Sequence, residues 1–320
     1  MFKSKKWFRN FLQYIGLLGG SGFYVYQLSK GIHSVIAMGT FNPFGFLGLI
    51  LSVVLGLAFN YFQIINWILI LKGMKITISL ESCIKNYRLS FIARYIPGSI
   101  WGYLSRSEWL YRSYGISYRI SSWASLIEII IPLLAAIMVI ILYASTLAPR
   151  WLVSFFFLGS ILAPMIIWRL MDFLRKRITW PLTYSEDRFY FPLRYWLTCV
   201  VIFLINWGLS GLMVYTLIFS LNPAFTSLNF FLAIRDWFKA TFAFAVSWMI
   251  GFLVLFVPAG MGVREAALQN LLRYVFGLPY EQALIISVWS RLILLLSEGL
   301  WLIIGLFIHT EGEILSLPRE

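Results

Sequence analysis

The stretch FGFLGLILSVVLGLAFNYFQIINWILIL, residues 44–71, contains no charged residue. The hydrocarbon core of a bilayer is about 30 Å thick, and about 20 apolar residues cross it as a helix, so this stretch predicts a membrane span. A second uncharged run covers residues 195–234. One charge at the centre of such a helix costs roughly 2.5–3.5 kcal/mol, which accounts for its absence. The two runs therefore predict an all-α membrane protein.

The composition of the whole chain supports the same class. Of its 320 residues, 60% are hydrophobic and only 12% are charged, whereas a soluble domain carries about 25% charge. The net charge of +13 is typical of nucleic-acid binding, but the basic residues lie between apolar runs, where membrane orientation explains them. We expect no nucleic-acid partner. Cys83 and Cys199 are isolated and only two histidines occur, so we expect no metal and no cofactor.

Apolar runs and their interruptions predict the organisation of the chain. Two stretches, 79–117 and 258–278, are neither good spans nor ordinary loops, because charges or a proline-glycine turn interrupt them. We expect a single integral membrane domain over residues 1–320, an all-α polytopic bundle of seven or eight spans with two broken or re-entrant segments. The spans are expected at 11–29, 44–71, 121–144, 151–171, 195–220, 229–257 and 282–308.

The basic residues predict the orientation. Eighteen of the 26 precede the first span or lie in the connections 72–119 and 169–194. The alternate connections carry only Lys30 and Arg150. The positive-inside rule then places the N-terminus in the cytoplasm and the protein in the cell's inner membrane. The acidic tail favours a C-terminus on the outer side of the membrane. The C-terminus lies on the cytoplasmic side instead if one interrupted stretch crosses the membrane.

A pattern recurs at the two interrupted stretches. In each copy a proline-glycine bend is followed 18 or 19 positions later by a glycine that leads into a charged apolar span. Either the chain contains a duplication, with units at about 44–144 and 229–308, or two bends coincide by chance. The predicted orientation puts both copies on the cytoplasmic side, as a parallel repeat. The copies contain Pro97, Gly98, Gly115 and Glu128, and Pro258, Gly260, Gly277 and Arg291.

The second interrupted stretch has the chemistry of an anion site. Pro258 ends one helix, Gly260 and Gly262 permit a tight turn, and a new helix is expected from Glu265 onward. A helix N-terminus with Arg264 beside it suits a phosphate group. Alternatively, Glu265 complements the helix dipole and Arg264 extends to the membrane interface.

The first interrupted stretch is similar. Pro97 and Gly98 predict a break, with Arg94 before it and Arg106 two turns beyond it. Broken helices are tolerated at membrane depth only where they are buried in protein or line a cavity. An amphipathic segment at the interface would collect the same residues.

Three charges lie within otherwise apolar spans, which makes them functional candidates. Arg291 and Glu298 are seven positions apart and share a helix face, and we expect Glu128 to face Arg291 across the repeat. A purely structural buried pair is the alternative. Tryptophans near span ends predict an aromatic belt without a ligand role; examples are Trp67, Trp151 and Trp196.

These two stretches resemble those of the flippase-like family built on the transmembrane domain of lysylphosphatidylglycerol synthases. The resemblance lies in RYIPGSIW at 94–101 with Arg106 and Glu128, and in VPAGMGVREAA at 257–267 with Ser290 and Arg291. Ala259 stands where a second glycine is usual, and Glu128 lacks the arginine that often follows it. The resemblance implies a membrane protein that handles a lipid or a lipid-linked glycan, since in the synthases this domain is thought to move the charged lipid across the bilayer.

We therefore expect a lipid translocator whose partner is an anionic phospholipid or a polyprenyl-phosphate-linked glycan. We expect no conventional enzyme, because no P-loop, HExxH or G-x-S-x-G motif occurs, and no aminoacylation, because 12 residues follow the last expected span. The alternatives are a membrane transferase with Glu128 or Glu265 as base and a non-catalytic partner of a glycan-assembly complex. The candidate binding residues are Arg94, Pro97, Gly98, Arg106, Glu128, Pro258, Gly260, Gly262, Arg264, Glu265, Arg291 and Glu298.

Overall fold

The structure, a computed structural model, has helices as its regular secondary structure throughout the residues that it describes. These are residues 29, 43–93, 101–144, 151, 154, 158–159, 191–221, 230–254 and 257–307. They contain eight α-helices, one 3-10 turn and no strand, which confirms the all-α bundle. The expected span at 11–29 and nearly all of the one at 151–171 lie outside the described residues.

Four of the described helices are long and apolar enough to cross a membrane. With 27 to 31 residues each, they are about 40 Å long or more. They confirm the spans expected at 44–71, 121–144, 195–220 and 282–308. The helices are α2 (Pro43–Gly73), α5 (Tyr118–Ala144), α7 (Leu193–Leu221) and α10 (Tyr280–Phe307).

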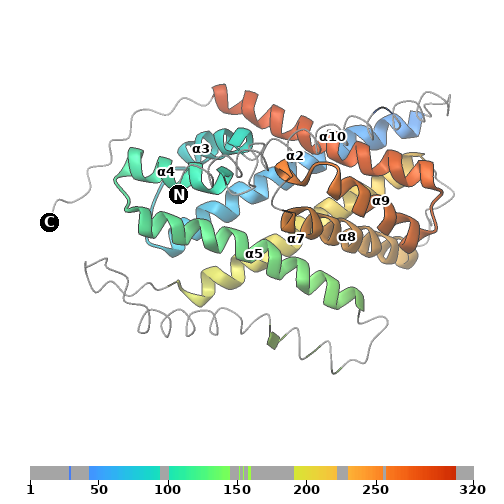
Figure 1. The fold of residues 1–320 in the computed structure, drawn as a ribbon, viewed down its shortest axis with the longest axis horizontal. Coiled ribbons are helices and arrows are strands. Elements are labelled where there is room, and N and C mark those ends of the chain that lie inside the picture. Colours follow the sequence, from blue (N-terminus) through green and yellow to red (C-terminus); the bar gives the residue numbers. More distant parts are fainter. Residues whose placement is uncertain are drawn as a thin grey trace, which may run out of the picture.

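The contact between α2 and α7 forms the centre of the bundle (Figure 1). Ser52 Oγ lies 2.7 Å from Thr216 Oγ1, and Asn66 Nδ2 donates to the Cys199 carbonyl at 3.0 Å. A Cβ on Gly48 would lie 1.8 Å from Ser220 Oγ. Within lipid there is no hydrophobic driving force between helices, so close packing of small residues and interhelical hydrogen bonds stabilise such contacts. Each of these hydrogen bonds is worth about 0.6 kcal/mol.

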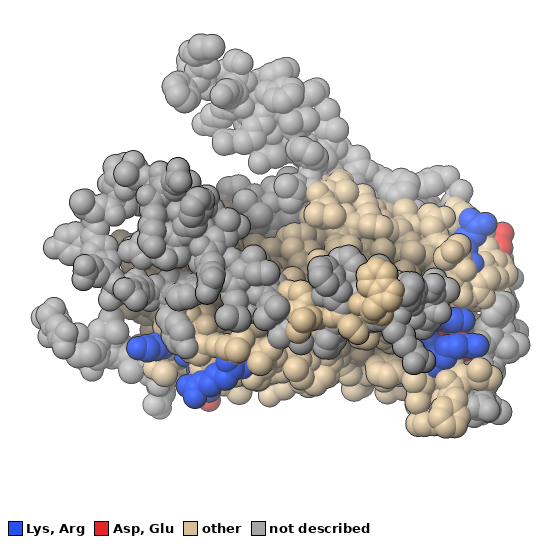
Figure 2. Space-filling model, turned by 90° about the horizontal axis from the view of Figure 1, so that it is seen from below, with Lys and Arg blue, Asp and Glu red and all other residues tan. Residues whose placement is uncertain are grey.

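These contacts also define the two ends of the bundle. Residues near the start of α2 meet the end of α7, so the two helices are antiparallel. The α10 helix is parallel to α2, because Gly56 lies against Ser297 while Tyr61, further along α2, stacks on Trp301, further along α10 (Figure 1). Figure 2 shows charged groups toward both ends, with an uncharged surface between them. We call the end where α2 and α10 finish the basic end; it carries Lys72, Lys75, Lys85, Arg112 and Arg194.

The first interrupted stretch folds as a helical hairpin that enters from the basic end. It consists of α3 (Leu80–Ala93) and α4 (Trp101–Tyr114), each 14 residues and so about 21 Å long, too short to cross. Ser125 Oγ donates to the Tyr103 carbonyl, and the rings of Tyr111 and Tyr118 stack, so α4 is antiparallel to α5. The α4 helix therefore ends where α5 begins, at the basic end.

The second interrupted stretch forms a hairpin that enters from the opposite end. The α8 helix (Phe230–Leu253) is followed by the turn Pro258–Gly260 and by α9 (Val263–Phe276). The Lys239 ammonium lies over the Phe276 ring, so α9 returns along α8. Tyr143, at the end of α5, stacks on Phe242 of α8. The segment predicted to span at 229–257 is a helix, but the chain then doubles back.

This reversal corrects one expectation. The hairpins enter from opposite ends (Figure 1), so the predicted parallel arrangement is wrong and the geometry is inverted. The α10 helix ends at the basic end, which is one of the two alternatives that the sequence left open for the last span. The physical cause is a turn of left-handed residues, since Ala259, Gly260 and Gly262 have φ of 50°, 66° and 80°. Whether the two halves arose by duplication stays a prediction.

Candidate functional site

A cavity with charged groups in its wall is lined by residues of both hairpins. Tyr87 and Tyr103 of the first hairpin and Arg264 of the second line it, as do Glu128 and Arg291 of the long helices. The cavity has a volume of about 80 Å³. Glu128 is the eleventh of 27 residues in α5, and Arg291 is the twelfth of 28 in α10, so both lie near helix midpoints. The two interrupted stretches thus build one cavity at mid-depth in the bundle.

A buried ion pair between Arg106 and Glu128 joins the first hairpin to α5. Arg106 Nη2 lies 2.6 Å from Glu128 Oε2, and Nη1 donates to Ser90 Oγ at 2.6 Å. The Arg106 side chain is fully buried, with its guanidinium 4.5 Å from the Tyr87 ring centre and 5.3 Å from that of Trp67. Tyr87 donates its hydroxyl proton to Glu128 Oε1. Arg106 therefore lies behind the cavity wall and holds Glu128 in place.

The prediction that Glu128 and Arg291 would be each other's ion-pair partner is wrong. Glu128 takes Arg106, and Arg291 Nε lies 3.6 Å from Glu265 Oε1. Each pair joins the short helix of a hairpin to the long helix that follows it. The acidic partner is on the long helix in the first pair and on the short helix in the second. Glu128 and Arg291 nevertheless line the same cavity.

The turn of the second hairpin places Arg264 at the cavity. Glu265 accepts a hydrogen bond from the Gly262 N–H at 2.6 Å, which caps the start of α9. The Arg264 guanidinium lies 5.4 Å from the Trp248 ring centre. Its aliphatic stem packs against Gly251, where a Cβ would lie 2.1 Å from Arg264 Cγ. The interpretation that Glu265 complements the dipole of α9 is thus supported. Arg264 in turn lines the cavity.

Gly260→Ala is expected to weaken the second hairpin more than a matched substitution elsewhere. A Cβ on Gly260 would lie 2.7 Å from the Gly251 carbonyl oxygen, and its φ is +66°. Backbone strain of about 1 kcal/mol would add to a collision costing about 1–3 kcal/mol. Gly277→Ala is the control, because its φ is +67° with nothing within 4 Å. Thermal melting of the purified variants should separate them; equal melting temperatures would contradict the close approach.

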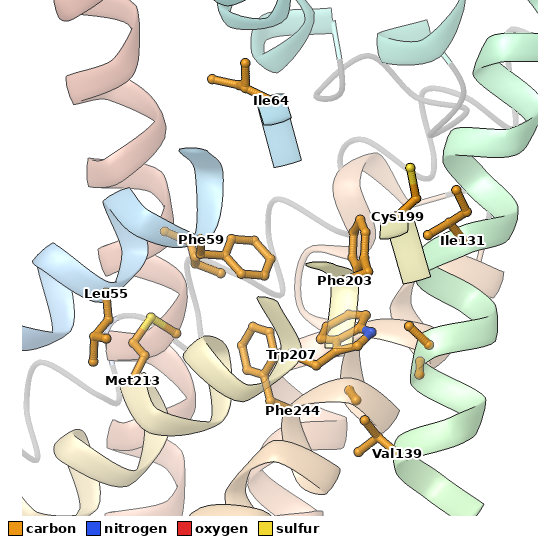
Figure 3. Close-up of a cluster of buried hydrophobic side chains, with 14 of the residues drawn as sticks. Leu55, Phe59, Ile64, Ile131, Val139, Cys199, Phe203, Trp207, Met213 and Phe244 are labelled. Atoms are coloured by element: carbon orange, nitrogen blue, oxygen red, sulfur yellow. The ribbon is translucent and has the colours of Figure 1, made fainter. Parts of the chain in front are cut away.

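Aromatic rings form another part of the wall. Trp207 has ring centres at 5.9 Å from Phe203, 6.3 Å from Phe244 and 5.3 Å from Trp248. Figure 3 shows Phe59, Phe203, Trp207 and Phe244 gathered in the centre of the bundle. These rings give the cavity an apolar border beside its charged groups.

The remaining predicted residues fall into separate groups. Arg94, Pro97 and Gly98 lie outside the described residues. Arg291 and Glu298 share a helix face, as expected, and both line the cavity. The aromatic-belt prediction is wrong for Trp67 and Trp196, which are buried, whereas Trp151 is exposed. Sequence reasoning missed three residues that line the cavity: Gln63, Asn66 and Pro132. The available signal was a polar side chain or a proline within an otherwise apolar span.

One exposed cluster at the basic end lies apart from the cavity. Tyr118 donates its hydroxyl proton to Glu108, and Arg112 pairs with the same carboxylate at 2.5 Å. The hydrogen bond from Tyr118, and then that from Arg112, hold the pKa of Glu108 below its ordinary value. Exposed pairs of this kind contribute little stability, so the cluster supplies controls for the buried pairs.

The fold and the cavity define an integral membrane protein, a helix bundle with two re-entrant hairpins around a charged site at mid-depth. Residues 16–300 match the family model described as the lysylphosphatidylglycerol synthase TM region, and the chain belongs to this family. The match covers both hairpins and the cavity, and it confirms the resemblance of the two motif stretches. No curated protein matches the chain.

Proposed function

We propose that the protein translocates a lipid, with the headgroup passing through the cavity while the acyl chains stay in the bilayer. The observation that carries the proposal is the placement of Arg264 and Arg291 in one cavity near the helix midpoints. A phosphate group in bare hydrocarbon is very costly, and fixed cations with polar surroundings lower that cost. An anionic or zwitterionic phospholipid and a polyprenyl-phosphate-linked glycan share this phosphate chemistry.

The inverted hairpins support passage rather than one-sided binding. Each hairpin enters from a different end, and residues of both hairpins line the same cavity. Inverted halves around a central site are the usual architecture of alternating-access transporters. The positive-inside rule places the basic end, with Lys72 and Arg194, in the cytoplasm of a cell with an inner membrane. Translocation of this kind needs no covalent chemistry from the chain.

The proposal is tested by reconstitution of the purified protein into vesicles containing a phospholipid labelled on an acyl chain. A membrane-impermeant reductant bleaches only the outer leaflet of protein-free vesicles. With the protein inserted, exchange between leaflets should expose nearly all of the label. Bleaching that stops at the outer leaflet for phospholipids and for a labelled polyprenyl-phosphate lipid would overturn the proposal.

Two alternatives give different results with the same material. A chemically new lipid formed from a lipid donor would indicate a transferase, with Glu128 or Glu265 as the base. Glu128 argues against that role, because its carboxylate is held in a buried ion pair with the guanidinium of Arg106. Inactivity together with stable co-purification of a glycosyltransferase would indicate a non-catalytic partner.

A further inference from the structure

The charged side chains that line or back the cavity in the described part of the chain sum to zero. Arg264, Arg291, Glu128 and Glu298 line it, and Arg106 and Glu265 pair with lining residues from behind. An uncompensated charge buried in a low-dielectric site is strongly unfavourable. A headgroup with one net negative charge would leave the occupied site unbalanced, whereas a headgroup of zero net charge would not. The balance therefore selects for a zwitterion among phosphate-bearing lipids.

Hydrogen-bond acceptors on α2 and α5 point to the cationic half of that zwitterion. Asn66 lines the cavity, and its Oδ1 has no hydrogen-bond partner in the described part of the chain. Pro132 also lines the cavity, and because it has no N–H, the Glu128 carbonyl lacks its donor within α5. A carboxylate can accept more hydrogen bonds than the two that Glu128 receives. These acceptors suit a group with several N–H donors.

We propose, on the basis of the translocation proposed above, that the lipid is a zwitterionic phospholipid with a primary ammonium. Its phosphodiester binds at Arg264 and Arg291 on α9 and α10. Its ammonium binds at Glu128 and Asn66 on α5 and α2. An anionic glycerol headgroup has the phosphate but neither the balancing charge nor the ammonium donors.

The test compares two acyl-chain-labelled lipids, phosphatidylethanolamine and phosphatidylglycerol, in the same proteoliposomes. Exchange of phosphatidylethanolamine should be at least about tenfold faster, a discrimination that corresponds to about 1.4 kcal/mol. Phosphatidylglycerol exchanged as fast or faster would overturn the zwitterion assignment and leave translocation standing.

Thermal melting in detergent with short-chain forms of both lipids separates the two proposals. Stabilisation by phosphatidylethanolamine alone, without exchange of either lipid in vesicles, would support the headgroup assignment and overturn translocation. Failure of phosphatidylethanolamine to stabilise the protein, together with no exchange, would overturn both.

A charge change in the cavity should shift the selectivity. Glu298→Gln gives the cavity a net positive charge, so the ratio of ethanolamine to glycerol exchange rates should fall at least about tenfold. Glu108→Gln is the control, because Glu108 is at the basic end and outside the cavity lining. A merely structural role for Glu298 would leave this ratio of exchange rates unchanged. An unchanged ratio in Glu298→Gln would therefore overturn the charge-matching argument.

Discussion

Arg106→Ala is expected to lower the free energy of unfolding by about 3–5 kcal/mol, because it leaves the charge of Glu128 buried without its partner. Arg106 is fully buried, and its guanidinium binds Glu128 and Ser90 while stacking on aromatic rings. The loss should appear as a large fall in melting temperature in detergent. This result would assign Arg106 a structural role, in contrast to the headgroup ligand that its sequence position predicts.

Two further variants make that result specific. Arg112→Ala breaks an ion pair in which the arginine is 76% exposed, and we expect it to cost no more than about 0.5 kcal/mol. The double variant Arg106→Leu with Glu128→Leu removes both charges, so it should recover much of the loss. A double variant as unstable as Arg106→Ala would contradict the unpaired-charge explanation. If Arg106→Ala kept the wild-type stability but lost lipid exchange, Arg106 would instead be a ligand of the headgroup.

Arg264→Ala is expected to reduce lipid exchange by about 30-fold or more while the protein stays folded. Removing one member of a desolvated charge contact costs about 2–5 kcal/mol, and 1.4 kcal/mol corresponds to a factor of ten. Arg264 lines the cavity and lies over Trp248. The same vesicle assay measures the effect, with the melting temperature recorded for each variant.

Arg235→Ala is the matched control for Arg264→Ala. Its side chain is 59% exposed and it pairs with Asp236 at the opposite end of the bundle. It removes the same charge and similar side-chain volume outside the cavity, so exchange should remain close to that of the wild type. Equal rates for Arg264→Ala and Arg235→Ala would remove Arg264 from the site.

Much of the fold can be predicted from the sequence alone. Uncharged runs of 20 or more residues have few alternatives to a membrane helix, so α2 and α7 are predictable from them. Charges and glycine-proline bends likewise identify the two interrupted stretches. The direction of the chain after α8 is not predictable in this way, because the apolar run at 229–257 resembles a span in the sequence, although α8 itself is not among the helices apolar enough to cross a membrane. The turn in which Ala259, Gly260 and Gly262 have positive φ follows α8, and the chain reverses there.

The site is predictable as a set of residues but not as a set of contacts. Intramembrane charges must find partners, so Glu128, Glu265 and Arg291 are recognisable as candidates. Their pairing depends on which helices the fold brings together, and the assumed parallel arrangement paired Glu128 with Arg291. In the structure Glu128 pairs with Arg106, on the adjacent short helix. Asn66 carried no distinguishing signal beyond its polarity within α2.

The site and the proposed function both depend on the two hairpins entering from opposite ends of the bundle. Single cysteines introduced as Ser113→Cys, at the end of α4, and Arg273→Cys, at the end of α9, occupy exposed positions, whereas the native Cys83 and Cys199 are fully buried. A membrane-impermeant maleimide should label Arg273→Cys in intact cells and Ser113→Cys only after permeabilisation. Labelling of both variants from the same side would contradict the inverted arrangement.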